Sequence, residues 1–168
     1  MMICFLGLGS NLGDRFDNIF KAVQKLDGAH GIKVDRVSGV YETDPIGDPE
    51  QPKYLNAAVG VETELEPKAL LKTCLAIERE MGRVRRKRWE SRLIDIDVLL
   101  CGDTVLSMKE LIVPHPLLHE REFVLRPLFD IAPGFVHPIL DETVAEMLDH
   151  VERSCVCKMD DLDLGGFR

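Results

Sequence analysis

The sequence predicts an α+β fold in which two helices cover one face of a mainly antiparallel sheet, the split βαβ arrangement. Apolar residues alternate or run continuously over short stretches typical of strands, and between these stretches they recur at the 3.6-residue period of a helix. The resulting order is strand, helix, strand, strand, helix, strand, followed by a C-terminal appendix. A length of 168 residues corresponds to about one domain. We therefore expect residues 1–168 to form a single domain.

The first strand and the first helix are predicted at the N-terminus. The apolar run over residues 2–8 is typical of a buried strand, and apolar residues at helical spacing predict an amphipathic helix over residues 14–27. The connection between them is rich in glycine. A tight turn, with Ser10 or Asn11 near the helix cap, accounts for the glycines within residues 7–13.

Two strands and a long loop follow. An interrupted alternation of apolar residues predicts a half-buried strand over residues 32–41, and strand character returns over residues 54–61. Residues 42–53 contain prolines and a glycine that can continue neither a helix nor a sheet. Loops of this length inside a compact domain are usually either functional or disordered.

The second half of the chain repeats the pattern and then adds an appendix. A second helix is predicted to open at Pro67, because proline suits the first helical position. A strand over residues 93–100 follows it. Two short helices are predicted around residues 123–129 and 143–151. The acidic tail over residues 155–168 is expected to be frayed.

Composition excludes several classes of protein. The chain has 21 Lys and Arg against 29 Asp and Glu, a net charge of -8, which argues against a protein that mainly coats nucleic acid. No apolar run approaches the roughly 18 residues that a membrane span needs. Five cysteines without a Cys-x-x-Cys pair indicate a reducing compartment. We expect a cytoplasmic protein.

The strongest local charge lies within residues 83–92. This segment has six basic residues and one acidic residue, a net +5, and five of the six are Arg. A charge run is often only a solvated surface, but the planar guanidinium suits phosphate oxygens. The segment also contains Trp89, the only Trp of the chain, which could stack on a base. The pattern predicts phosphate binding and leaves both a nucleotide and a nucleic acid open.

Two carboxylates follow this segment on a predicted strand. Side chains alternate between the two faces of a strand, so Asp95 and Asp97 share one face while Ile96 and Val98 share the other. Buried carboxylates are costly unless cations accompany them. Together with the arginines upstream, the pair predicts a site for Mg²⁺ and a polyphosphate.

His115 is a third candidate. It stands between Pro114 and Pro116, which restrict its backbone. A ring held in this way suits a fixed hydrogen-bond donor to a phosphate oxygen.

With these residues in view, the chain resembles the 6-hydroxymethyl-7,8-dihydropterin pyrophosphokinase family. The resemblance extends from Gly7 to about Pro138, and its specificity lies in the order and spacing of the motifs. These motifs are Gly7-x-Gly-Ser-Asn-Leu-Gly13, Tyr41-x-Thr-x-Pro-x-Gly47, Gln51-Pro-x-Tyr-Leu-Asn-Ala-Ala58, Glu78-x-x-x-Gly-Arg-x-Arg85, Arg88-Trp-x-x-Arg-x-x-Asp-x-Asp97, Val113-Pro-His-Pro116, Arg121-x-Phe123 and Pro127-Leu-x-x-Ile-Ala-Pro133.

The resemblance implies a ferredoxin-like fold and a reaction. The family moves the pyrophosphoryl group of ATP to the hydroxymethyl oxygen of the pterin and leaves AMP, a step of folate biosynthesis. It also implies two Mg²⁺ ions, with Asp95 and Asp97 as the metal ligands. ATP and the pterin are then the partners, with no nucleic acid and no membrane, and we expect a monomer.

The resemblance also assigns roles to single residues. It implies catalytic roles for Arg83, Arg92, Asp95 and Asp97. It implies ATP binding by Glu78, Arg85, Trp89, Val98, His115 and Arg121. It implies pterin binding by Thr43, Ile46, Tyr54, Asn56 and Phe123. One departure is Glu90-Ser91, where the family commonly has Gly-Pro or a small equivalent.

A nucleic-acid-binding α+β module is the alternative. It would use the basic segment 83–92 to grip phosphates. It leaves Asp95 and Asp97 unexplained, because carboxylates repel a phosphate backbone.

Overall fold

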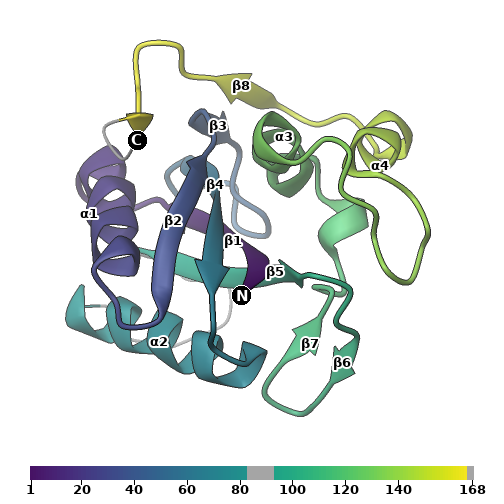
Figure 1. Ribbon diagram of the computed structural model, residues 1–168. Coiled ribbons are helices and arrows are strands. Elements are labelled where there is room, and N and C mark those ends of the chain that lie inside the picture. The colour runs from purple at the N-terminus through teal and green to yellow at the C-terminus, as the bar shows by residue number, and fades with distance from the viewer. Residues whose placement is uncertain (83–92, 166–168) are drawn as a thin grey trace.

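A six-stranded sheet separates two layers of helices (Figure 1). The computed structural model describes residues 1–82 and 93–165. The strands of this sheet are β1 (Met2–Ser10), β2 (Ile32–Val37), β3 (Tyr41–Thr43), β4 (Tyr54–Thr63), β5 (Asp95–Cys101) and β8 (Val156–Lys158). The helices are α1 (Arg15–Asp27), α2 (Pro67–Glu80), α3 (Glu122–Ile131) and α4 (Val144–His150), and a 3-10 turn, η1 (Leu118–Glu120), precedes α3. A small hairpin of β6 (Leu106–Ser107) and β7 (Ile112–Val113) follows β5.

The strand order confirms the predicted arrangement. The order is β5-β1-β4-β3-β8, with β2 also paired to β4, and every pairing is antiparallel. The two central strands β1 and β4 are therefore joined through β2 and β3, while β5 returns to the far side of β1. This is the ferredoxin-like split βαβ order.

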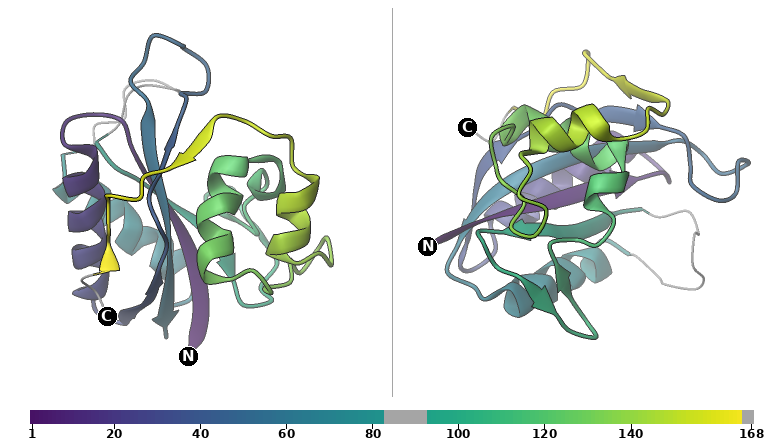
Figure 2. Two further views of the ribbon diagram at one scale, coloured as in Figure 1. Left: turned by 90° about the horizontal axis from the view of Figure 1, so that it is seen from above. Right: turned by 90° about the vertical axis from the view of Figure 1, so that its right-hand side faces the viewer.

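The two helical layers cover opposite faces of the sheet and form separate cores. Helices α1 and α2 lie on one side, and α3 and α4 lie on the other (Figure 2, left). A large apolar core between α1, α2 and the sheet includes Leu6, Leu8 and Val23. A second core under α3 and α4 includes Phe5 and Leu125. Consecutive residues of β1 thus enter different cores, because side chains alternate across a strand.

The predicted strand over residues 32–41 is two strands. The register of β2 against β4 shifts between Val34 and Arg36, a β-bulge that explains the interrupted alternation. Beyond β2, the Ser38 hydroxyl accepts a 2.8 Å hydrogen bond from the Ala58 N–H. The Ser38 N–H also donates to the Ala58 carbonyl, at 2.9 Å. The side-chain contact at Ser38 separates β2 from β3.

The cap of α1 is Asp14, and the prediction of Ser10 or Asn11 was wrong. The Asp14 Oδ1 accepts a 3.0 Å hydrogen bond from the Asp17 N–H, the usual N-cap contact. Ser10 is the last residue of β1. The Asn11 Nδ2 instead donates to the carbonyl of Pro52, at 3.2 Å, and so joins the start of the chain to the end of the long loop.

The C-terminal segment corrects the expectation of a frayed tail over residues 155–168. Val156–Lys158 forms β8, which pairs with β3 and extends the sheet. Leu164 is 1% exposed and packs into the core of α1 and α2. Acidic composition did not reveal this pairing, because it joins segments far apart in the sequence. Within the described ranges, no helix has the length and hydropathy that a membrane-spanning segment needs.

Candidate active site

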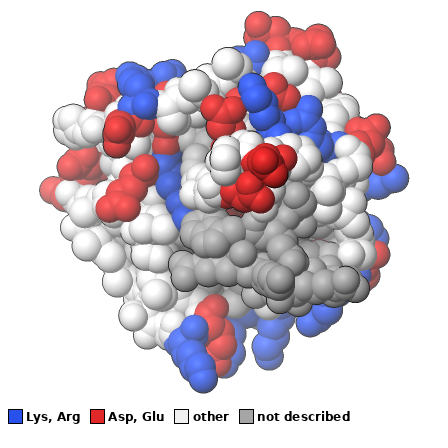
Figure 3. Space-filling view, turned by 180° about the vertical axis from the view of Figure 1, so that it is seen from behind, with Lys and Arg blue, Asp and Glu red and all other residues white. Residues whose placement is uncertain are grey.

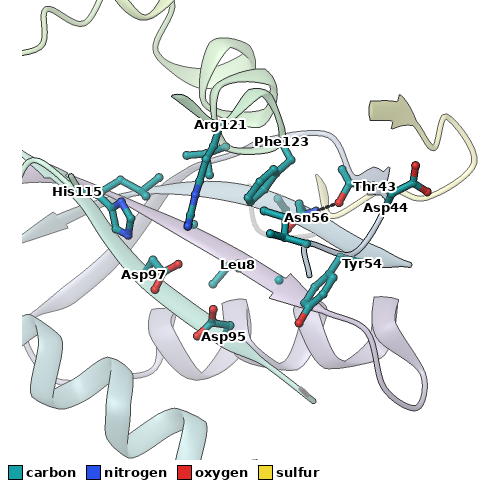
Figure 4. A pocket seen from close by; sticks show the side chains of 16 residues that line it. Leu8, Thr43, Asp44, Tyr54, Asn56, Asp95, Asp97, His115, Arg121 and Phe123 are labelled. Atoms are coloured by element: carbon teal, nitrogen blue, oxygen red, sulfur yellow. Dashed lines mark hydrogen bonds between the residues drawn. The ribbon is translucent and has the colours of Figure 1, made fainter. Parts of the chain in front are cut away.

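A cavity of about 290 Å³ lies on the sheet face that carries α3 (Figure 4). Four strands, the segment after β7 and the start of α3 contribute to its wall. Its lining residues are Gly7, Leu8, Gly9, Thr43, Asp44, Ile46, Tyr54, Asn56, Ala57, Asp95, Asp97, Leu99, His115, Arg121, Phe123 and Val124.

The acidic side of the cavity is β5. Asp95 and Asp97 are half-buried and both line the cavity, as strand alternation predicts. Ile96 and Val98 are each 3% exposed and enter the opposite core with α1 and α2. The two carboxylates therefore lie on one sheet face, where cations can approach them.

The floor of the cavity is backbone. Gly7 pairs with Asp97 and Gly9 pairs with Asp95 across the β1–β5 ladder. A Cβ at Gly9 would lie 3.1 Å from the Asn56 Oδ1 and 3.6 Å from the Tyr54 Cδ1. The tight-turn explanation was thus wrong for Gly7 and Gly9, which lie inside β1 and keep the floor free of side chains.

Two aromatic rings form the apolar end. Tyr54 begins β4 and Phe123 lies in the first turn of α3, and Figure 4 shows both rings entering the cavity from opposite walls. Between them, the Asn56 Nδ2 donates a 2.7 Å hydrogen bond to the Thr43 Oγ1. Since this bond fixes the Asn56 amide, the end of the cavity can select the polar edge of a flat ligand.

The cationic side faces β5. The His115 N–H donates to the Leu99 carbonyl at 2.9 Å, which ties the segment after β7 to β5. The Leu117 N–H donates to the His115 Nδ1 at 3.2 Å, so the neutral ring carries its proton on Nε2. Burial, and then the charge of Arg121, lower the pKa of His115 to about 4, against the opposing effect of Asp95. His115 is therefore a neutral donor at neutral pH.

Arg121 completes this side. It caps α3, and in Figure 4 its side chain extends from the helix toward β5. Its guanidinium carbon lies 5.6 Å from the centroid of the Phe123 ring, a cation–π distance. One short segment thus supplies a cation for the acidic end and a ring for the apolar end.

Two predicted ATP contacts lie away from the cavity. Glu78 is 2% exposed beneath β5, where its Oε1 accepts a 2.8 Å hydrogen bond from the Ile96 N–H. The Val98 side chain faces the core on the other side of the sheet. Neither side chain lines the cavity, and the ATP-binding roles implied for both residues stay predictions. The hydrogen bond of Glu78 fixes the strand that carries the two aspartates.

Several of the predicted site residues lie outside the described part of the chain. Arg83, Arg85, Trp89 and Arg92 lie outside the described residues, as does Glu90-Ser91. The roles given to them stay predictions.

Sequence reasoning also missed residues that line the cavity. They are Gly7, Leu8, Gly9, Asp44, Ala57, Leu99 and Val124. Leu99 follows Asp97 by two positions, so alternation alone could have found it. Gly7 and Gly9 required the register of β1 against β5, which no local pattern gives.

The fold and the site define a class of protein: an α+β domain with a cavity that is acidic and cationic at one end and aromatic at the other. Comparison with known proteins identifies the family. The model of the 7,8-dihydro-6-hydroxymethylpterin-pyrophosphokinase family matches residues 5–133. The 2-amino-4-hydroxy-6-hydroxymethyldihydropteridine pyrophosphokinase of Methylorubrum extorquens is 47% identical over 154 residues, 92% of this chain and 96% of the relative. That of Aquifex aeolicus is 41% identical over 146 residues, 87% of this chain and 90% of the relative.

The chain belongs to this family, and the predicted resemblance is confirmed. It is an enzyme of folate biosynthesis that transfers the pyrophosphoryl group of ATP to hydroxymethyldihydropterin. A structure titled Plasmodium falciparum HPPK-DHPS wild type with pteroate shares the fold, with a TM-score of 0.71 at 16% identity. The match covers 88% of this chain and 44% of that one, so this chain spans less than half of that protein.

Proposed function

We propose that this cavity is the active site, with the pterin between Tyr54 and Phe123 and the ATP phosphates between β5 and the pair His115 and Arg121. One observation supports the proposal above all. Residues from separate segments of the chain, which share no local sequence signal, line one cavity of about 290 Å³.

The apolar end fits a flat heterocycle. Aromatic rings favour stacking on a planar ligand, and the backbone floor at Gly9 leaves room for the ligand to approach β1. The Asn56 amide, held by Thr43, would bond to the polar edge of the pterin. Ile46 of the loop before β4 also lines the cavity.

The polar end fits a polyphosphate. The neutral His115 would donate through Nε2–H, and the Arg121 guanidinium would contribute a full positive charge. Both would orient the phosphates for in-line attack by the pterin hydroxyl. Positioning and electrostatics of this kind supply most of the rate in phosphoryl transfer. Arg83 and Arg92 would add further charge.

The donor set at β5 fits Mg²⁺. Asp95 and Asp97 would hold it, two ions by our prediction. In the described part of the chain no three His, Cys, Asp or Glu side chains group together as a metal cage. Mg²⁺ suits this arrangement, since it usually takes one or two carboxylates and completes its shell with phosphate oxygens and water. When bound, it would neutralise phosphate charge and lower the pKa of the attacking hydroxyl.

The nucleic-acid alternative is not supported. The family assignment accounts for the aspartates that this alternative leaves unexplained. On the face seen from behind, basic side chains of the described residues are interspersed with acidic ones (Figure 3). We also propose that the enzyme works as a cytoplasmic monomer without nucleic-acid or membrane partners, which gel filtration and cell fractionation test.

A product assay with a metal titration tests the proposal. With ATP, Mg²⁺ and 6-hydroxymethyl-7,8-dihydropterin, we expect AMP rather than ADP, and we expect EDTA to stop turnover. Asp95→Asn should raise the Mg²⁺ concentration for half-maximal rate by at least about tenfold. Asp103→Asn is the matched control, because Asp103 is exposed in the turn after β5 and does not line the cavity. An unchanged Mg²⁺ requirement in Asp95→Asn would refute the metal assignment.

A further inference from the structure

The segment from Arg153 to Lys158 follows the residues that the family model matches. It contacts Glu122, the residue before Phe123, and pairs with Thr43 of the cavity wall. We propose that Glu122 is a positioning residue that, through Ser154, uses this segment to hold the Phe123 wall in place for the pterin. The inference rests on the proposed location of the pterin.

Glu122 is a buried carboxylate at the first position of α3, only 4% exposed. Its Oε2 accepts hydrogen bonds from the Ser154 N–H and, at 3.1 Å, from the Ser154 hydroxyl. Its Oε1 accepts from Arg126 at 3.1 Å and from Arg153 at 3.4 Å. A buried charge persists only when it is compensated in this way. Three of the four contacts therefore fix the first turn of α3 to the C-terminal segment, and the fourth, from Arg126, lies within α3.

The charge state of Glu122 agrees with this role. Burial raises its pKa, but hydrogen bonds from Ser154, Arg126 and Arg153 outweigh burial and hold the pKa below its ordinary value. Glu122 is thus anionic at neutral pH, and each of its bonds is charge-assisted. Such bonds are about twice as strong as neutral ones.

The residues on either side of Glu122 line the cavity. Arg121 and Phe123 both do so, and they cannot move independently of the helical turn between them. The other end of the segment reaches β3, because Val156 of β8 pairs with Thr43. Figure 1 shows β8 passing from α4 above α3 to the edge of β3. The segment therefore bridges the two elements that carry Phe123 and Thr43.

The wall lacks packing behind it. A second hollow of about 360 Å³ lies there, and its lining includes Ile46, Phe123, Ser154 and Cys155. Phe123 is half-buried and lines both this hollow and the cavity. The position of its ring then depends on the polar anchor at Glu122 rather than on a filled core.

The test compares two glutamates that accept the same pair of hydrogen bonds, one buried and one exposed. Glu146 accepts hydrogen bonds from the N–H and the hydroxyl of Thr143, as Glu122 does from Ser154, but it caps α4 and does not line the cavity. We would measure the Kd of 6-hydroxymethylpterin by fluorescence and the Kd of ATP with Mg²⁺ by calorimetry, in Glu122→Gln, Glu146→Gln and Ser154→Ala, each verified as folded by circular dichroism.

Glu122→Gln should weaken pterin binding about tenfold, because the amide can satisfy only one side of the network. ATP affinity should change less than about twofold, and Glu146→Gln should leave both affinities unchanged, although it also loses a cap. Ser154→Ala, which removes only the hydroxyl contact, should weaken pterin binding by about twofold to threefold. This milder variant keeps the test decisive if Glu122→Gln does not fold.

Unchanged pterin affinity in the folded variants would overturn the proposal, as would an equal loss in Glu146→Gln. Phe123→Ala separates this failure from failure of the proposed function. If Phe123→Ala weakens pterin binding and the Glu122 and Ser154 variants do not, only the positioning role is wrong. If Phe123→Ala has no effect, the location of the pterin is wrong.

Discussion

The two faces of β5 differ in what they contribute. On one face, Ile96 and Val98 are buried among apolar side chains from α1 and α2. On the other face, Asp95 and Asp97 line an open cavity above a floor of glycines. Neighbouring residues of one strand thus serve stability and chemistry separately. Substitutions on the two faces should therefore separate loss of activity from loss of folding.

The largest expected effect is on the cavity face. Asp97→Ala removes a predicted metal ligand and should lower kcat by at least about 10³-fold. The melting temperature should change little, because Asp97 is half-buried at a cavity rather than packed in a core. Single-turnover kinetics and thermal melts of the same preparation measure both. Activity within tenfold of the unmodified enzyme would contradict the role of Asp97.

For the adjacent residue, Ile96, we expect a loss of stability rather than a loss of activity. Ile96→Ala leaves a hole in the core of α1 and α2 and should lower the free energy of unfolding by about 2–5 kcal/mol. Denaturant unfolding measures this loss. The kcat per folded molecule should stay within a few-fold of the starting enzyme. A large loss of kcat in the folded protein would show that the two faces are not independent.

A smaller effect is expected at the floor. Gly9→Ala would bring a Cβ to 3.1 Å from the Asn56 Oδ1, so the amide must shift. We expect pterin affinity to fall about tenfold, because the shifted amide would lose its hydrogen bond to the pterin. Overpacking should lower the free energy of unfolding by about 1–3 kcal/mol. The control is Gly134→Ala, since a Cβ there has no atom within 4 Å. Equal pterin affinities in the two variants would show that the floor does not limit the site.

The smallest effect concerns pH. Burial and Arg121 lower the pKa of His115 from 6.5 to about 4. Between these values the unfolded chain binds a proton that the folded protein does not, so this residue decreases stability as the pH falls from 6.5 to 4 and has no such effect above 6.5. His115→Gln should flatten that part of the stability curve. Nitrogen NMR should find the Nε2–H form at pH 6, and a titration midpoint near 6.5 would contradict this.

The sequence predicted the elements with strong local patterns. Alternation located the aspartates of β5 on one face, and helical spacing located α1 and α2. The split between β2 and β3 escaped prediction, because the hydrogen bonds between Ser38 and Ala58 that separate the two strands are long-range. The place of β8 escaped it too, since its pairing with β3 is long-range.

The cavity could be anticipated only through the family resemblance. Tyr54, Asn56, His115 and Phe123 carry no shared local signal and come together through the strand order and the packing of α3. The contact of Glu78 with β5 escaped prediction for the same reason. The Glu78 carboxylate accepts a hydrogen bond from the backbone of β5, and this partner is known only once α2 is packed against β5.

The glycine floor has a consequence for inhibition. A compound that lies flat on β1 would contact the peptide groups of Gly7 and Gly9, which no point substitution can delete. A substitution there can only add atoms, and added atoms would obstruct the natural substrate together with the drug. Resistance should therefore arise more readily at the aromatic walls than at this surface.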